Sequence, residues 1–263
     1  MEGDRAVLED ILITEKLTVR LGGIVALDDV SIQVPLGKTF AIVGREGAGK
    51  FAFLRLLSGH LKPTDGMILY KGSEISTLDP LIRIRLGIGS AFSPGSIEPR
   101  LSLLENVKWA VQNTIGVRYQ LISHYKSYDD SEHKAYECLR QVGLGEKYSC
   151  FASELNQWEK KKLEIAITIG LDPALMLLRE PTLNMTENQA EEIKDILLHI
   201  KNKKKATILM IENRASILRE CCDEVLIFEE GRFISQKKPA EILECPFTPY
   251  LDDVQLDSVR KFG

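Results

Sequence analysis

The sequence has few of the residues that mark small secreted or metal-binding proteins. Its 263 residues include five cysteines and four histidines. The cysteines are odd in number, contain one adjacent pair and show no C-x-x-C spacing. This usage excludes a disulfide scaffold and is typical of reduced thiols in a reducing compartment. The histidines show no metal-ligand spacing either, so no structural metal site is expected.

A long hydrophobic run is also missing. No stretch approaches the roughly 18 apolar residues that cross a bilayer. The N-terminal segment from Met1 to Arg5 is mixed in charge and has no apolar secretory region. We therefore expect no direct membrane insertion. The expected location is cytoplasmic, and on the cytoplasmic face of the inner membrane where a partner holds the chain there.

Neither sign of charge dominates. Lysine and arginine number 34 and aspartate and glutamate 38, which gives a net charge of −4. Dedicated nucleic-acid binders usually have a basic domain with a pI above about 9, so no nucleic-acid partner is expected. The hydrophobic fraction of 44% and the charged fraction of 27% are close to those of soluble globular proteins, which excludes a disordered chain.

Short β-rich runs alternate with helical stretches, a pattern that predicts an α/β fold with a largely parallel sheet. The runs at 174–178 and 206–211 are apolar without alternation, which is typical of strands buried on both faces. From about residue 102 to 170 the pattern is helical and predicts an inserted helical subdomain. The remaining predicted strands are 17–19, 30–34, 39–43 and 67–70.

The strongest local signal lies between Thr39 and Lys50, where an apolar run leads into a glycine-rich loop and then into a helical pattern. Glycines let a backbone wrap closely around an anion, and a helix N-terminus presents backbone amides to phosphate oxygens. Lys50 is placed to meet the outer phosphates. The residues predicted to bind a nucleotide are Gly44, Gly47, Ala48, Gly49 and Lys50.

The residue after the lysine departs from this pattern. A phosphate loop requires Ser or Thr there, because the hydroxyl binds Mg²⁺, and this chain has Phe51. The phenyl ring offers no ligand atom and fills the space that a metal ion and its water need. Glu46 adds a carboxylate to a loop meant for anions. ATP binding is therefore expected to be weak, and Mg²⁺ is not expected.

Further stretches make the chain resemble the ATP-binding subunits of ABC transporters, and among them most of all the branched-chain amino acid and urea uptake type. The stretches include LDDVSI at 27–32, LSGHLKPTDG at 57–66, LSLLENV at 101–107 and EPT at 180–182. The resemblance implies a RecA-like P-loop core with an N-terminal antiparallel β subdomain and an inserted helical subdomain. It assigns 1–92 and 171–238 to the core, 93–170 to the helical signature subdomain, and 239–263 to a C-terminal helix and tail.

The resemblance also implies partners. Members of the family form head-to-tail dimers, in which each ATP lies between the phosphate loop of one subunit and the signature motif of the other. The second subunit is either another copy of this chain (a homodimer) or a different ATP-binding subunit (a heterodimer), and the sequence does not choose between them. The family meets a membrane permease at the segment that corresponds to Ser93 to Val107, so docking to a permease is expected there.

Residue by residue, many family positions are degenerate. Glu180 stands where the family has its general base, and a doubtful, vestigial role is expected for it. Three departures, at 51, 93 and 179, fall in the metal shell that the resemblance implies. The departing residues are Leu21 for the adenine-stacking aromatic, Phe51, Ser93 for a glutamine, Asn156, Gln157 and Trp158 in the signature, Arg179 for a metal-binding aspartate, Thr186 for Asp or Asn, and Asn213 for a phosphate-sensing histidine.

These departures favour a pseudo-ATPase that acts as the structural or regulatory partner of a permease, an active ATPase subunit, or both. One alternative is a slow ABC ATPase with a rearranged site and Glu180 as its base. Another is a scaffold subunit of a soluble complex. Arg179 has two interpretations: an ion pair with Glu46 or Glu180 that locks the pocket, or neutralisation of phosphates in place of a metal ion.

Trp158 also has two interpretations, an exposed interaction anchor and a ring packed over the helical subdomain. The lysines at 160–162 are expected to be the solvated start of a helix.

Overall fold

A computed structural model describes residues 10–92, 95–118, 126–204 and 206–243. Its larger sheet has six strands in the order β10-β9-β3-β8-β7-β6. β10 pairs antiparallel with β9, and the other neighbours are parallel, as predicted from the alternation of strands and helices. The strands are β3 (Thr39–Val43), β6 (Ile88–Ser90), β7 (Leu175–Arg179), β8 (Thr207–Ile211), β9 (Glu224–Glu229) and β10 (Arg232–Lys237).

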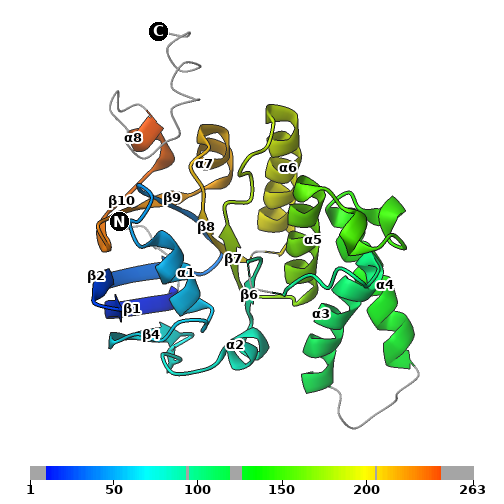
Figure 1. Ribbon diagram of the computed structural model, residues 1–263, viewed down its shortest axis with the longest axis horizontal. Helices are drawn as coiled ribbons and strands as arrows, with labels where there is room; N and C mark the ends of the chain where they lie inside the picture. The colour runs from blue at the N-terminus through cyan, green and yellow to red at the C-terminus, as the bar shows by residue number, and fades with distance from the viewer. Residues whose placement is uncertain (1–9, 93–94, 119–125, 205, 244–263) are drawn as a thin grey trace, which may run out of the picture.

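A second, antiparallel sheet has the order β2-β1-β4-β5. It consists of β1 (Asp10–Leu21), β2 (Ile24–Pro35), β4 (Asp65–Tyr70) and β5 (Ser73–Glu74). Helix α1 (Lys50–Leu57) lies beside this sheet (Figure 1), and its buried residues Phe53, Leu54, Leu56 and Leu57 share one core with both sheets. The helix that follows the glycine loop is thus fixed between the two sheets.

The strands of the larger sheet alternate their side chains between two cores, because successive residues of a strand face opposite sides. Phe40 and Ile42 face α1 and the antiparallel sheet, whereas Ala41 and Val43 face a second core formed by helices. The helices of that second core are α3 (Leu103–Arg118), α4 (Lys126–Gln141), α5 (Gln157–Gly170), α6 (Glu187–Lys204), α7 (Ala215–Cys221) and α8 (Pro239–Leu243).

Helices α3 and α4 lie at the end of the molecule opposite β1 and β2 (Figure 1). Short helices complete the chain: α2 (Pro80–Leu86), η1 (Gly145–Lys147) and η2 (Ala152–Glu154). Among the described residues, no helix is both long and apolar enough to cross a membrane.

Each predicted strand overlaps an observed one, and the predicted buried runs become β7 and β8, whose residues 175–178 and 207–211 are buried. Sequence analysis missed β5, β6 and the β9–β10 hairpin. The described part of 102–170 consists of helices joined by turns, with one isolated bridge between Ser102 and Phe151. The boundaries at 92–93 and 170–171 stay predictions, and residues 244–263 of the predicted tail lie outside the described residues.

Candidate functional site

The glycine loop connects β3 to α1, and its close contacts explain two of its glycines. A Cβ at Gly49 would lie 2.5 Å from the Ala26 carbonyl oxygen, and one at Gly44 would collide with the carbonyl of Phe228. Gly49 is also the residue that precedes α1, with φ at 88°, and no side chain caps the helix there. The first turn of α1 holds no acidic residue, so this helix end is open to an anion.

Lys50 lies folded over the loop that precedes it. Its Nζ donates hydrogen bonds to the carbonyl oxygens of Gly44 and of Arg45, the latter at 2.8 Å. Ala48 is buried and Glu46 is exposed. The ammonium group therefore stands beside the loop that the sequence assigns to phosphate binding.

Phe51, the residue after Lys50, contacts an aromatic ring and a guanidinium. Its ring meets the edge of Phe92, with centroids 5.7 Å apart, and the Arg179 guanidinium carbon lies 4.1 Å from its centroid. A guanidinium within about 6 Å of a ring face is attracted by the ring quadrupole. Phe51 thus contacts the side chain of Arg179, the last residue of β7.

Arg179 also pairs with Glu180, with Nε 3.5 Å from Oε2. Of the partners considered for this arginine, Glu180 is the one that the structure brings into contact. The pair lies near the surface, since 44% of the Arg179 side chain is exposed. Such an exposed pair adds little stability, but it occupies the carboxylate that stands at the general-base position.

The loops that follow β7 and β8 are joined by a buried carboxylate. Glu212 accepts a hydrogen bond from the Thr182 hydroxyl at 2.6 Å and others from the backbone amides of Asn213 and Arg214. Burial raises the pKa of Glu212, and these hydrogen bonds oppose the rise. The Asn213 side-chain oxygen is buried and has no hydrogen-bond partner among the described residues, and ordered water commonly satisfies such a group.

The N-terminus of α5 carries the signature positions, and here side chains close the helix end. The Asn156 side chain accepts from the Glu159 amide at 3.0 Å, and Glu159 accepts from the Asn156 amide at 3.1 Å. Glu159 is 8% exposed and pairs with Lys147 at 2.5 Å. Burial alone would raise the pKa of Glu159, but its hydrogen bonds to Lys147 and Asn156 lower it. An ionised carboxylate therefore sits where an anion would otherwise bind.

Trp158 packs against the helical core, and the Lys162 Nζ lies 3.9 Å from its ring centroid. The packed interpretation of Trp158 is the one that this geometry favours. Lys162 is itself 4% exposed and pairs with Glu192 of α6. The prediction of a solvated lysine run is therefore wrong for Lys162, because its ammonium is held between a ring and a carboxylate.

The structure brings Phe51, Arg179 and Glu180 together at the phosphate loop, whereas the signature residues lie at the start of a different helix. Leu21 ends β1 and is 45% exposed, and Thr186 is exposed just before α6. Ser93 lies outside the described residues. Sequence analysis missed the capping role of Asn156 and Glu159, although Asn-x-x-Glu before a helical run is a known N-terminal pattern.

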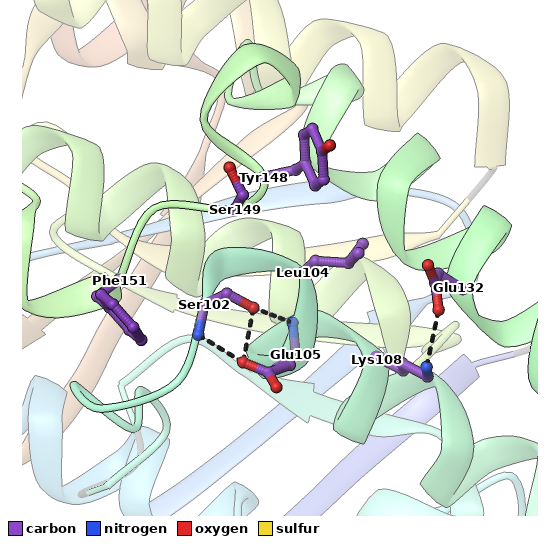
Figure 2. A pocket seen from close by; sticks show the side chains of 8 residues that line it. All are labelled: Ser102, Leu104, Glu105, Lys108, Glu132, Tyr148, Ser149 and Phe151. Carbon is purple, nitrogen blue, oxygen red and sulfur yellow. Dashed lines mark hydrogen bonds and ion pairs between the residues drawn. The ribbon is translucent and has the colours of Figure 1, made fainter.

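A cavity of about 460 Å³ opens in the helical region (Figure 2). Glu105 faces it from the start of α3 and accepts hydrogen bonds from the Ser102 hydroxyl at 2.7 Å and its amide at 2.8 Å, which lower the pKa of Glu105. Lys108 points toward Glu132, 3.0 Å away. The cavity is lined by Ser102, Leu104, Glu105, Lys108, Glu132, Tyr148, Ser149 and Phe151.

Comparisons with known proteins agree with this geometry. A family model described as ABC transporter matches residues 27–183. The methionine import ATP-binding protein MetN of Staphylococcus haemolyticus is 29% identical over 225 residues, which are 85% of this chain and 63% of that protein. The MetN protein of Escherichia coli K12 is 28% identical with the same coverage. The chain thus spans less than two thirds of the length of these relatives.

Solved structures share the fold. The protein cbiO1 of Clostridium perfringens, part of an ABC transporter complex, is 26% identical with a TM-score of 0.74, and the match covers 89% of this chain and 91% of that one. A nucleotide-free ATP-binding cassette gives a TM-score of 0.73 at 24% identity, over 88% and 92% of the two chains. The predicted fold class is confirmed. The branched-chain amino acid and urea subtype stays a prediction.

The comparisons overturn the expectation of weak ATP binding without Mg²⁺. The matched region includes the glycine loop, and the relatives are named ATP-binding proteins. The physical reason is that Mg²⁺ needs few protein ligands, because water, phosphate oxygens and one or two carboxylates complete its shell. Among the described residues no cluster of three metal-binding side chains exists, but Glu180, with 30% of its side chain exposed, offers one carboxylate beside the loop.

Proposed function

The chain belongs to the ABC transporter family, and from that premise we propose that it is an ATP-binding subunit of an importer that binds ATP with Mg²⁺ and does not hydrolyse it. Binding is supported by the open N-terminus of α1 and by Lys50 over the loop. Bound Mg²⁺ would neutralise phosphate charge, and Glu180 is the residue suited to approach it. The loop amides and Lys50 would hold the phosphates.

The pairing of Glu180 with Arg179 is the observation that carries the loss of turnover. A general base must accept a proton from the attacking water, and the Glu180 carboxylate already faces the Arg179 guanidinium, with Oε2 3.5 Å from Nε. The closed N-terminus of α5 adds a second reason. In the family's head-to-tail dimer this helix end would approach the phosphates bound by a partner subunit, and Glu159 presents negative charge there.

Titration of the purified chain with MgATP, together with a phosphate-release assay, tests this proposal. Lys50→Ala removes a charged hydrogen-bond donor and is expected to weaken binding by at least about ten-fold. Lys237→Ala is the matched control, because Lys237 is an exposed lysine at the end of β10, outside the loop. Turnover of the unsubstituted chain is expected to equal that of Lys50→Ala.

Two outcomes would contradict the proposal. No MgATP binding by the unsubstituted chain would overturn the nucleotide-binding function. Measurable turnover that both Lys50→Ala and Glu180→Gln abolish would instead favour the slow ATPase with Glu180 as its base.

We further propose that a membrane permease docks at the cavity of Figure 2 and places there a cationic side chain. Docking is expected near Ser93 to Val107, and Ser102 and Glu105 of that segment line the cavity. Glu105 is ionised, and the exposed rings of Tyr148 and Phe151 add apolar area beside it. A lysine or arginine of the permease would meet both a carboxylate and aromatic faces. In this role the chain would be peripheral to the membrane.

Binding to permease subunits of the source organism's importers, each reconstituted in nanodiscs, tests the docking site. Glu105→Gln keeps the side-chain acceptor that caps α3 but removes the charge, and it is expected to weaken association several-fold, up to about ten-fold. Glu74→Gln on β5 is the matched exposed control. Equal binding by both variants would contradict a cationic contact at Glu105. No association with any permease would favour the soluble scaffold.

A further inference from the structure

Arg83 of α2 is a fully buried cation that the nucleotide chemistry proposed above does not use. Its side chain is 0% exposed. A guanidinium has five N–H donors, and this one donates to the carbonyl oxygens of Leu56, Leu57, Ile75, Ser76 and Leu78. Burial lowers the pKa of Arg83 to about 10, with the charge of Asp79 opposing the shift, so the group stays protonated at neutral pH.

Two of these acceptors belong to the last turn of α1. The Arg83 Nη1 donates to Leu56 and to Leu57, the latter at 3.0 Å, and α1 ends at Leu57. The last carbonyls of a helix have no partner within the helix, and negative charge gathers at that end. The buried guanidinium satisfies both needs at once.

The space around the guanidinium is made by a glycine. A Cβ at Gly59 would lie 3.1 Å from the Arg83 Nε and 3.0 Å from the Leu78 carbonyl oxygen. The chain leaves α1 through this residue at a φ of 83°, a conformation that glycine adopts without strain. The end of α1, the turn after it and α2 are therefore built around one side chain.

The other end of α1 is the phosphate loop. The helix has eight residues, or about 12 Å at 1.5 Å per residue. So short a helix is not stable by itself; its buried side chains hold it between the two sheets, and contacts at its ends complete its placement. We infer that Arg83 is a positioning residue, which fixes the C-terminal end of α1 and thereby the aim of the amides and of Lys50 at its N-terminal end. This inference rests on the proposed binding of nucleotide at that loop.

The test compares Arg83→Lys and Arg83→Ala with the unsubstituted chain in MgATP titrations, well below each variant's unfolding midpoint. The lysine of Arg83→Lys keeps the charge but cannot reach five acceptors. The MgATP affinity of this variant is therefore expected to fall about ten-fold. The MgATP affinity of Arg83→Ala is expected to fall further. It should recover partly in low millimolar guanidinium, but not in sodium chloride at the same ionic strength. Arg85→Ala, an exposed arginine of the same helix, is the control and should bind normally.

Hydrogen exchange adds a readout without nucleotide. Loss of Arg83 is expected to raise exchange in α1 more than in β3 or β8. Unchanged MgATP affinity of both Arg83 variants would overturn the inference alone, even where their stability falls, because a merely structural residue affects stability only. No MgATP binding by the unsubstituted chain would overturn the proposed function, and this inference with it.

Discussion

The N-termini of α1 and α5 are the same kind of helix end with opposite local chemistry. Both carry the positive end of a helix dipole. Helix α1 begins after Gly49, without a side-chain cap and without an acidic residue in its first turn. Helix α5 begins after Asn156, and both members of a capping box, one of them the carboxylate of Glu159, bond to its backbone amides. The caps, rather than the dipole, decide which of the two ends is open to a phosphate.

This difference bears on a dimer of the family's head-to-tail kind. One half of such a site would be an open phosphate loop, and the other half would be a helix end that already holds a carboxylate. Nucleotide would then be gripped mainly from one side. Catalysis depends on groups placed where charge develops in the transition state, so the closed end of α5 fits an ATP-binding subunit with little turnover.

The largest effect is expected from adding a side chain at Gly49, the residue before the open end of α1. In Gly49→Ala the new Cβ would collide with the Ala26 carbonyl and crowd Leu27, and the residue would keep a φ of 88°. We expect the free energy of unfolding to fall by at least about 3 kcal/mol. Denaturant unfolding measures the loss, and MgATP affinity should fall with it.

Gly47→Ala is the matched control in the same loop. Its φ is 80°, but a Cβ there would meet nothing within 4 Å. The cost is then the strain of a left-handed residue alone, about 1–2 kcal/mol. Equal losses at the two glycines would mean that close contact with β2 does not shape the open end.

Much of this fold is predictable from the sequence, because the signals are local. The unbroken apolar runs of β7 and β8 and the glycine pattern before α1 indicate their own structure. The short β6 has three residues, and the β9–β10 hairpin depends on pairing with β3. Such strands form because a neighbouring strand is present, and that neighbour is distant in the sequence.

The site is less predictable, because its decisive contacts join distant residues. The sequence shows that Phe51 has no hydroxyl, but not that the Arg179 guanidinium stacks on its ring from the end of another strand. It leaves both Glu46 and Glu180 open as partners of Arg179, whereas the structure pairs Arg179 with Glu180. Lys162 was expected in solvent, yet Glu192 and Trp158 enclose it. A charged residue in a sequence does not reveal which distant side chains will bury it in the fold.

A smaller effect is expected from opening the closed end of α5. Glu159→Gln keeps a side-chain acceptor for the Asn156 amide but removes the charge that pairs with Lys147. The pKa of Glu159 is lowered in the folded chain from its ordinary 4.5. A lowered pKa stabilises the fold above the ordinary value, and this contribution is lost as the pH falls through the folded-state pKa. The variant should therefore be less stable near neutral pH and equal to the unsubstituted chain in acid.

Asn156→Ala separates charge from capping at the same helix end. It removes the acceptor for the Glu159 amide, which costs about 1 kcal/mol, and it leaves the ion pair with Lys147 in place. Its stability loss should therefore persist from neutral pH into acid, whereas that of Glu159→Gln should vanish. Thermal unfolding between pH 7 and the acid limit of folding measures both variants. A Glu159→Gln loss that does not change with pH would show that the carboxylate acts as a cap alone, and the negative charge would no longer distinguish α5 from α1.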